Sequence, residues 1–168
     1  MRKVLVLGAL ALLFAAPASS QADRQQPGDG CLVVTNGNGT VSISAQGGIV
    51  GRVDQGQVVI EDPNPADSSK PKVFGADVST GLSKTKTEYS GSNNLRFRFT
   101  GGGAFHVVVT GIGIDLSAIG RGKAMISGAH YVQTGGSYSA DPDSLCASNI
   151  RSFPDTPTKI VLGSPGTG

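Results

Sequence analysis

Short runs of alternating apolar and polar residues, separated by glycine-rich segments, recur along the chain. The clearest runs cover residues 40–45, 95–100 and 104–110. In the first run, Val41 and Ile43 fall on one face while serine and threonine fall on the other. A period of two is typical of a strand with one buried face. Turn signals recur about every 8–12 residues, which favours an antiparallel sheet.

This pattern predicts an all-β fold, either an antiparallel β-sandwich or a barrel-like domain. A β-solenoid is the alternative, because glycine-rich short strands also build solenoids, although no fixed repeat can be aligned. Residues 36–39, Asn-Gly-Asn-Gly, give the strongest hairpin signal in the chain. Residues 115–120 are expected to form one helical turn, capped by Asp115 and stopped by Gly120.

The beginning of the chain carries the pattern of a secretory signal peptide. Two basic residues precede an apolar run over residues 4–16, and small residues follow. The run is too short to span a hydrocarbon core, which needs about 20 residues. We therefore predict a signal peptide over residues 1–18, with cleavage after residue 18 or residue 22. The protein is expected to be secreted or held in the cell envelope, without a transmembrane segment.

Three further segments follow the predicted signal peptide. Residues 19–30 are polar and predicted to be a flexible lead-in. Residues 31–150 are expected to form one β domain, which is long enough to enclose a single core. Residues 151–168 are rich in proline and glycine and predicted to be a tail, with one edge strand expected at residues 158–162.

The chain has only two cysteines, Cys31 and Cys146. Outside the cytosol a lone pair of cysteines usually oxidises, so we predict a disulfide between them. Closing so long a loop stabilises the fold by about 4–5 kcal/mol in the chain-entropy model. The alternative is two free thiols, one of them nucleophilic, but nothing in the sequence marks either as an activated thiolate.

The charge balance argues against a nucleic-acid partner. The chain has 14 Lys+Arg and 12 Asp+Glu, and removing Arg2 and Lys3 with the signal peptide leaves 12 of each. Nucleic-acid-binding surfaces carry a basic excess because each phosphate contact needs a cation. We therefore expect no nucleic acid, and the partner is left open between an envelope polymer and a protein.

Two stretches resemble a known group of proteins. Residues 113–122, together with the Arg-Phe-Arg-Phe run at 96–99, resemble a family of small secreted bacterial proteins of unknown function. The resemblance covers roughly residues 31–138, the extent over which the strand pattern runs. It implies secretion and an all-β fold, and it brings no catalytic residues.

Arg96 and Arg98 are candidate binding residues. They lie on the polar face of one predicted strand, beside Lys84 and Lys86 if those strands pair. Such a cluster would bind an anion of an acidic cell-wall polymer or of lipid headgroups. The alternative is a solvated outer face whose charges oppose edge-to-edge pairing.

Asp62, Asn64 and Asp67 are candidate calcium ligands on one proline-containing loop. Calcium needs 6–8 oxygen ligands, and prolines preform such a loop. The spacing matches no established calcium loop, so solvated turn residues are the alternative.

Enzymatic function has little support in the sequence. Only His106 and His130 are available as a catalytic base, and neither lies near a Gly-x-Ser-x-Gly nucleophile motif. A secreted hydrolase that uses His106 with Asp115 or a loop acid is one alternative function, and a calcium-stabilised envelope module is another. The preferred hypothesis is an exported, non-enzymatic β domain that acts by surface contact and carries no cofactor.

Overall fold

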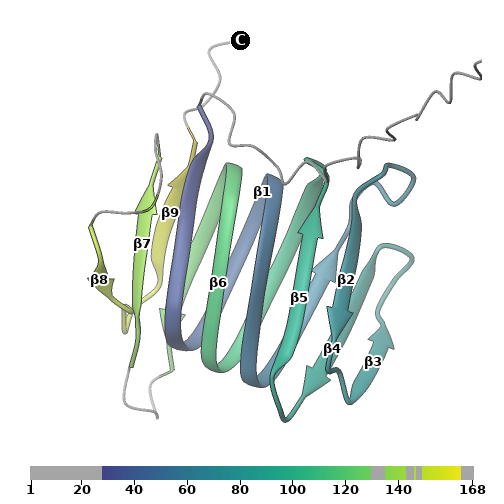
Figure 1. Ribbon diagram of the computed structural model, residues 1–168, viewed down its shortest axis with the longest axis horizontal. Helices are drawn as coiled ribbons and strands as arrows, with labels where there is room; N and C mark the ends of the chain where they lie inside the picture. Colours follow the sequence, from purple (N-terminus) through teal and green to yellow (C-terminus); the bar gives the residue numbers. More distant parts are fainter. Residues whose placement is uncertain (1–27, 130–134, 143–145, 147–148, 164–168) are drawn as a thin grey trace, which may run out of the picture.

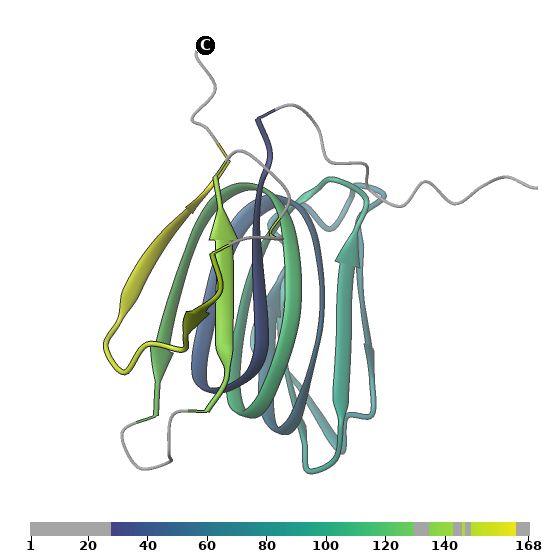
Figure 2. The ribbon, with the colours of Figure 1, turned by 60° about the vertical axis from the view of Figure 1, so that its left-hand side comes forward.

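The computed structural model describes residues 28–129, 135–142, 146 and 149–163. The described residues form nine strands and no helix. The strands pair antiparallel in one sheet (Figure 1). The sheet curls so strongly that it forms a half-barrel with two facing layers (Figure 2). The predicted all-β, barrel-like antiparallel fold is therefore confirmed.

Two strands are much longer than the rest. The usual strand has about 5–6 residues, whereas β1 has 32 and β6 has 25. In chain order the strands are β1 (Gly30–Glu61), β2 (Lys70–Phe74), β3 (Val78–Gly81), β4 (Lys86–Gly91), β5 (Leu95–Thr100), β6 (Ala104–Gly128), β7 (Ser137–Asp141), β8 (Arg151–Ser152) and β9 (Thr158–Leu162).

β1 and β6 form one antiparallel ribbon that coils on itself. Along this ribbon Thr40 pairs with Ser127, and Glu61 pairs with His106. One turn of the coil brings Thr40 also against Thr110 on its other side. The chain therefore passes alternately through the layer at the front of Figure 1 and the layer behind it. This antiparallel coil differs from a solenoid, which stacks repeats of one unit.

We call the two layers front and back after their positions in Figure 1. From one edge to the other, the front layer consists of β8, β7, residues 30–35 of β1, residues 114–120 of β6, residues 47–53 of β1, β5 and β2. The back layer consists of β9, residues 121–128 of β6, residues 39–46 of β1, residues 104–111 of β6, residues 55–61 of β1, β4 and β3.

Paired glycines form the corners where the ribbon crosses between layers. Gly47 and Gly120 are cross-strand partners, and each has a φ of 145°. A Cβ atom on Gly47 would lie 2.2 Å from the carbonyl oxygen of Ile119, and one on Gly120 would lie 2.1 Å from that of Gln46. Only glycine permits this φ and so close an approach of two backbones.

Two local predictions are wrong because both segments continue a long strand instead of ending one. Residues 36–39 close no hairpin but lie within β1, where Asn36 has a φ of 52°. Residues 115–120 form no helical turn but lie within β6. Asp115 does accept a backbone hydrogen bond, but from the N–H of Asn36 across the sheet (2.8 Å).

The hydrophobic core lies between the two layers. Alternate residues of each pass point inward, and the fully buried ones include Val41, Ile43, Phe99, Val107 and Ile114. Phe153, Ile160 and Leu162 are also buried in this core. The described part of the predicted C-terminal tail is therefore packed against the domain, and β9 covers the residues where an edge strand was expected.

The Cys31–Cys146 disulfide is confirmed, with 5.7 Å between the two Cα atoms. It joins the start of β1 to the segment that follows β7. The predicted signal peptide, most of the lead-in and residues 164–168 lie outside the described residues. Within the described ranges, no helix is long and apolar enough to cross a bilayer.

Candidate anion-binding face

Arg96 and Arg98 point away from the core because β5 alternates strictly between buried and exposed residues. The buried positions hold Leu95, Phe97 and Phe99, which fix the direction of the whole strand. A shift of one residue would bury both guanidinium groups, so the core itself holds the two arginines on the outer face of the front layer.

The neighbours of these arginines differ from those expected. Because β5 pairs with β1 and β2, Arg96 lies opposite Arg52, and Arg98 lies opposite Lys72. The predicted association with Lys84 and Lys86 is wrong, since Lys86 belongs to β4 in the back layer and Lys84 lies just before it.

One outer face of the front layer therefore collects cations from three neighbouring strands. The register and the alternation of β2 add Lys70 and Lys72 to the same side as the arginines. We call this surface the cationic face, and it consists of Arg52, Lys70, Lys72, Arg96 and Arg98. Sequence reasoning missed Arg52, Lys70 and Lys72, because only the pairing partners of β5 show that they belong to it.

Only one of these cations has an acidic partner among the described residues. The Arg52 guanidinium donates to the Asp115 carboxylate through Nε (2.9 Å) and through a second nitrogen (2.7 Å). The Asp115 hydrogen bond raises the pKa of Arg52 further above its ordinary range, with charge attraction from Asp115 and Asp54 as the next causes. The other four make no ion pair in the part of the chain that is described.

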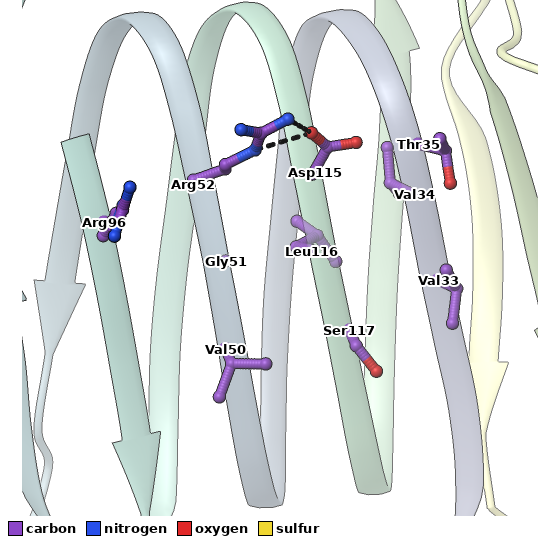
Figure 3. A pocket seen from close by; sticks show the side chains of 10 residues that line it. All are labelled: Val33, Val34, Thr35, Val50, Gly51, Arg52, Arg96, Asp115, Leu116 and Ser117. Carbon is purple, nitrogen blue, oxygen red and sulfur yellow. Dashed lines mark hydrogen bonds and ion pairs between the residues drawn. The ribbon is translucent and has the colours of Figure 1, made fainter. Parts of the chain in front are cut away.

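A shallow depression of about 460 Å³ adjoins the cationic face (Figure 3). Val33, Val50 and Ser117 line it with small side chains from three adjacent passes of the ribbon. Arg52 and Arg96 lie at its margin. The depression therefore combines an apolar surface with Arg96 and the Arg52–Asp115 ion pair along one side.

His106 lies on the outer face of the opposite, back layer. Its Nδ1 is 2.6 Å from the hydroxyl of Ser44, and Glu61 is its cross-strand partner on the other side. The structure thus brings together a serine, a histidine and a carboxylate. Ser44 and Glu61 were missed by sequence reasoning, although the alternation of residues 40–45 already placed Ser44 on the polar face. His130 lies outside the described residues.

The predicted calcium ligands lie in the loop between β1 and β2. The buried Asp62 carboxylate accepts the N–H of Asn64 (3.1 Å), and the Asp67 carboxylate accepts the N–H of Ser69 (2.7 Å). Asn64 and Asp67 line a depression of about 380 Å³ that Asp62 does not line. Both carboxylates stabilise the backbone of their own loop, as in an Asx turn. Calcium binding stays a prediction, and EDTA should lower the melting temperature if it is correct.

No protein-family model, curated protein or solved structure matches this chain. The resemblance of residues 113–122 to small secreted bacterial proteins therefore stays a prediction. What the geometry defines is a disulfide-closed antiparallel half-barrel with a cationic outer face on one layer.

Proposed function

We propose that this protein is an exported, non-enzymatic β domain that binds an anionic partner through its cationic face. The observation that carries the proposal is the direct cross-strand pairing of like charges, Arg52 with Arg96 and Lys72 with Arg98. Like charges directly opposite each other destabilise a sheet. A bound anion would convert this repulsion into charge-assisted hydrogen bonds. Arrangements that break a local rule in this way are expected at functional sites.

Export is supported by two independent features. The Cys31–Cys146 disulfide is a bond that persists in oxidising compartments outside the cytosol. The apolar run at residues 4–16 has the length and the flanking residues of a signal peptide. The envelope contains both anionic polymers and anionic lipids, and we propose that the protein binds its partner there.

Action without catalysis is supported by the surroundings of Ser44 and His106. Residues 39–46 and 104–111 are each paired with a strand on both sides. Their backbone N–H groups are therefore engaged in the sheet. Acyl-transfer chemistry requires N–H groups that converge on the reacting oxygen, and these do not. Hydrolytic turnover that disappears in His106→Ala would contradict this part of the proposal.

The test compares two double variants with the same change in net charge. Arg96→Glu/Arg98→Glu reverses the cationic face, and Lys123→Glu/Lys159→Glu reverses two exposed lysines of the back layer. Binding of the mature protein to soluble polyphosphate is measured by titration calorimetry. We expect the first variant to bind at least about tenfold more weakly, because direct contacts to the anion turn repulsive.

The control variant should bind nearly as the unchanged protein does. Affinity should also fall as salt is raised, because exposed charges are screened. Equal losses in the two double variants would show that only net charge matters and would refute a specific face. Circular dichroism of both variants establishes that each is folded.

A further inference from the structure

We infer that the anionic partner is the surface of a lipid bilayer, an inference that rests on the proposed function. Two large apolar side chains are exposed among the cations of the same outer face. Phe74 of β2 is 58% exposed and lies directly opposite Arg96. Val50 of β1 is 47% exposed and lies directly opposite Arg98. Each of the two arginines thus has an exposed apolar cross-strand neighbour.

This interleaving favours a lipid surface over a soluble polyanion. A polyanion gains nothing from Phe74 and Val50, which remain in water or beside a charged chain. A membrane interface accepts both kinds of side chain, because the headgroups attract the cations and the boundary with the acyl chains takes up the apolar groups. An exposed phenylalanine beside an arginine is thus explained by a bilayer and unexplained by a dissolved polymer.

The arrangement across strands points the same way. The cations lie on β1, β5 and β2, whose axes are about 4.8 Å apart in a sheet. A linear polymer lying along one strand would reach one row of cations at a time. A surface reaches all three rows at once. Asp115 pairs with Arg52 and the two charges offset each other, so Lys70, Lys72, Arg96 and Arg98 carry the positive charge of the face.

The depression beside the cationic face extends the apolar surface. Val33 and Val50 lie in it, and Arg96 lies at its margin beside the Arg52–Asp115 ion pair (Figure 3). An anionic amphiphile would place its headgroup on the arginines and its apolar part against the valines. Bilayer lipids with an anionic headgroup have this combination of groups.

The test is binding of the mature protein to phosphatidylcholine vesicles with and without phosphatidylglycerol, measured by co-sedimentation. We expect binding only with phosphatidylglycerol. Each cation removed, as in Lys72→Ser, should weaken binding about fivefold. Phe74→Ser should weaken it about tenfold through lost apolar burial. The matched control is Val161→Ser, since Val161 is 56% exposed on β9 in the other layer, and it should bind unchanged.

Soluble polyphosphate, added in a parallel titration, separates the two proposals. If the protein binds polyphosphate but not the anionic vesicles, or if Phe74→Ser binds the vesicles as tightly as the unchanged protein, the bilayer inference is overturned while the proposed function stands. If the protein binds neither, both fail. Because Phe74 is exposed on an edge strand, Phe74→Ser should keep the melting temperature, which confirms that a loss of binding is not a loss of fold.

Discussion

The two outer faces of the half-barrel are built from the same coiled ribbon, yet they distribute charge in different ways. On the back layer, two cross-strand pairs satisfy each other. Glu61 faces Lys86, with a carboxylate oxygen 3.9 Å from the ammonium nitrogen, and Ser44 is hydrogen-bonded to His106 at 2.6 Å. Compensating pairs of this kind stabilise the exposed face of a sheet.

On the front layer, Arg52 is ion-paired with Asp115 of the adjacent pass, but two other cross-strand pairs bring like charges together. Arg52 faces Arg96, and Lys72 faces Arg98. The same ribbon carries compensating pairs on the back layer. The fold therefore does not require the positive charge that is concentrated on the front layer. We therefore attribute the like-charge pairs of the front layer to binding and not to the stability of the fold.

The largest expected effect concerns the covalent closure of the front layer. Cys31→Ser/Cys146→Ser should lower the free energy of unfolding by about 4–5 kcal/mol, because a closed loop of this length restricts the unfolded chain. Cys31 lies in β1 opposite Asp141 of β7, so exchange protection should fall first at this edge of the front layer. Denaturant unfolding and amide exchange measure the two effects. An unchanged midpoint would mean that the bond contributes nothing to the fold.

A second prediction concerns the corners that both faces share. Gly47→Ala should cost about 3 kcal/mol or more, because its Cβ would collide with the carbonyl oxygen of Ile119 at a backbone φ of 145°. Gly81→Ala is the control, since an added Cβ there meets nothing within 4 Å. Thermal unfolding of both variants is the measurement. Similar melting temperatures for the two would contradict the assignment of the corner.

These corners also mark the limit of what the sequence could predict. The alternation of residues 95–100 and 104–110 depends on local burial, so the strands and their buried faces could be read directly. A glycine-rich segment looks the same whether it reverses the chain or folds a continuous ribbon over, because both need close backbones and positive φ. The 32-residue β1 was therefore expected as several shorter strands.

The candidate site shows the same division. The outward direction of Arg96 and Arg98 follows from the alternation of β5, and the sequence predicted it correctly. Their neighbours depend on which strands pair, which is a property of the long-range topology. Lys72 and Arg52 therefore could not be assigned to the cationic face, and Lys86 was wrongly placed beside it.

A third prediction sharpens the contrast between the faces directly. Lys72→Glu would place a carboxylate opposite Arg98 and should raise the free energy of unfolding by about 0.2–1 kcal/mol. Glu61→Lys would place a cation opposite Lys86 and should lower it by a similar amount. Lys72→Glu should at the same time weaken anion binding. If both substitutions destabilise the protein equally, the front face is not under repulsion.

The smallest effect concerns Asp77, in the turn after β2. The backbone N–H and the hydroxyl of Ser92 both donate to its carboxylate, at 2.8 Å and 2.9 Å, and they hold its pKa below the ordinary value of 3.8. A depressed pKa stabilises the fold above the unfolded value, and the contribution is lost as pH falls through the folded pKa. The effect is therefore confined to pH below about 4.

An NMR titration of the Asp77 side chain measures this pKa. Ser92→Ala removes the hydroxyl donor and should move the midpoint part of the way back toward 3.8, while the backbone N–H still lowers it. A midpoint at or above 3.8 in the unchanged protein would show that these hydrogen bonds do not form. Binding by the cationic face should be insensitive to this titration at neutral pH, where Asp77 stays ionised.

The most direct measurement of the difference between the faces is an amide chemical-shift map of the mature protein during titration with soluble polyphosphate. We expect the largest shifts in β2, in β5 and in residues 47–53 of β1, with little change in the back-layer passes that carry Ser44 and His106. Shifts spread evenly over both layers, or centred on the back layer, would contradict the assignment of anion binding to the cationic face.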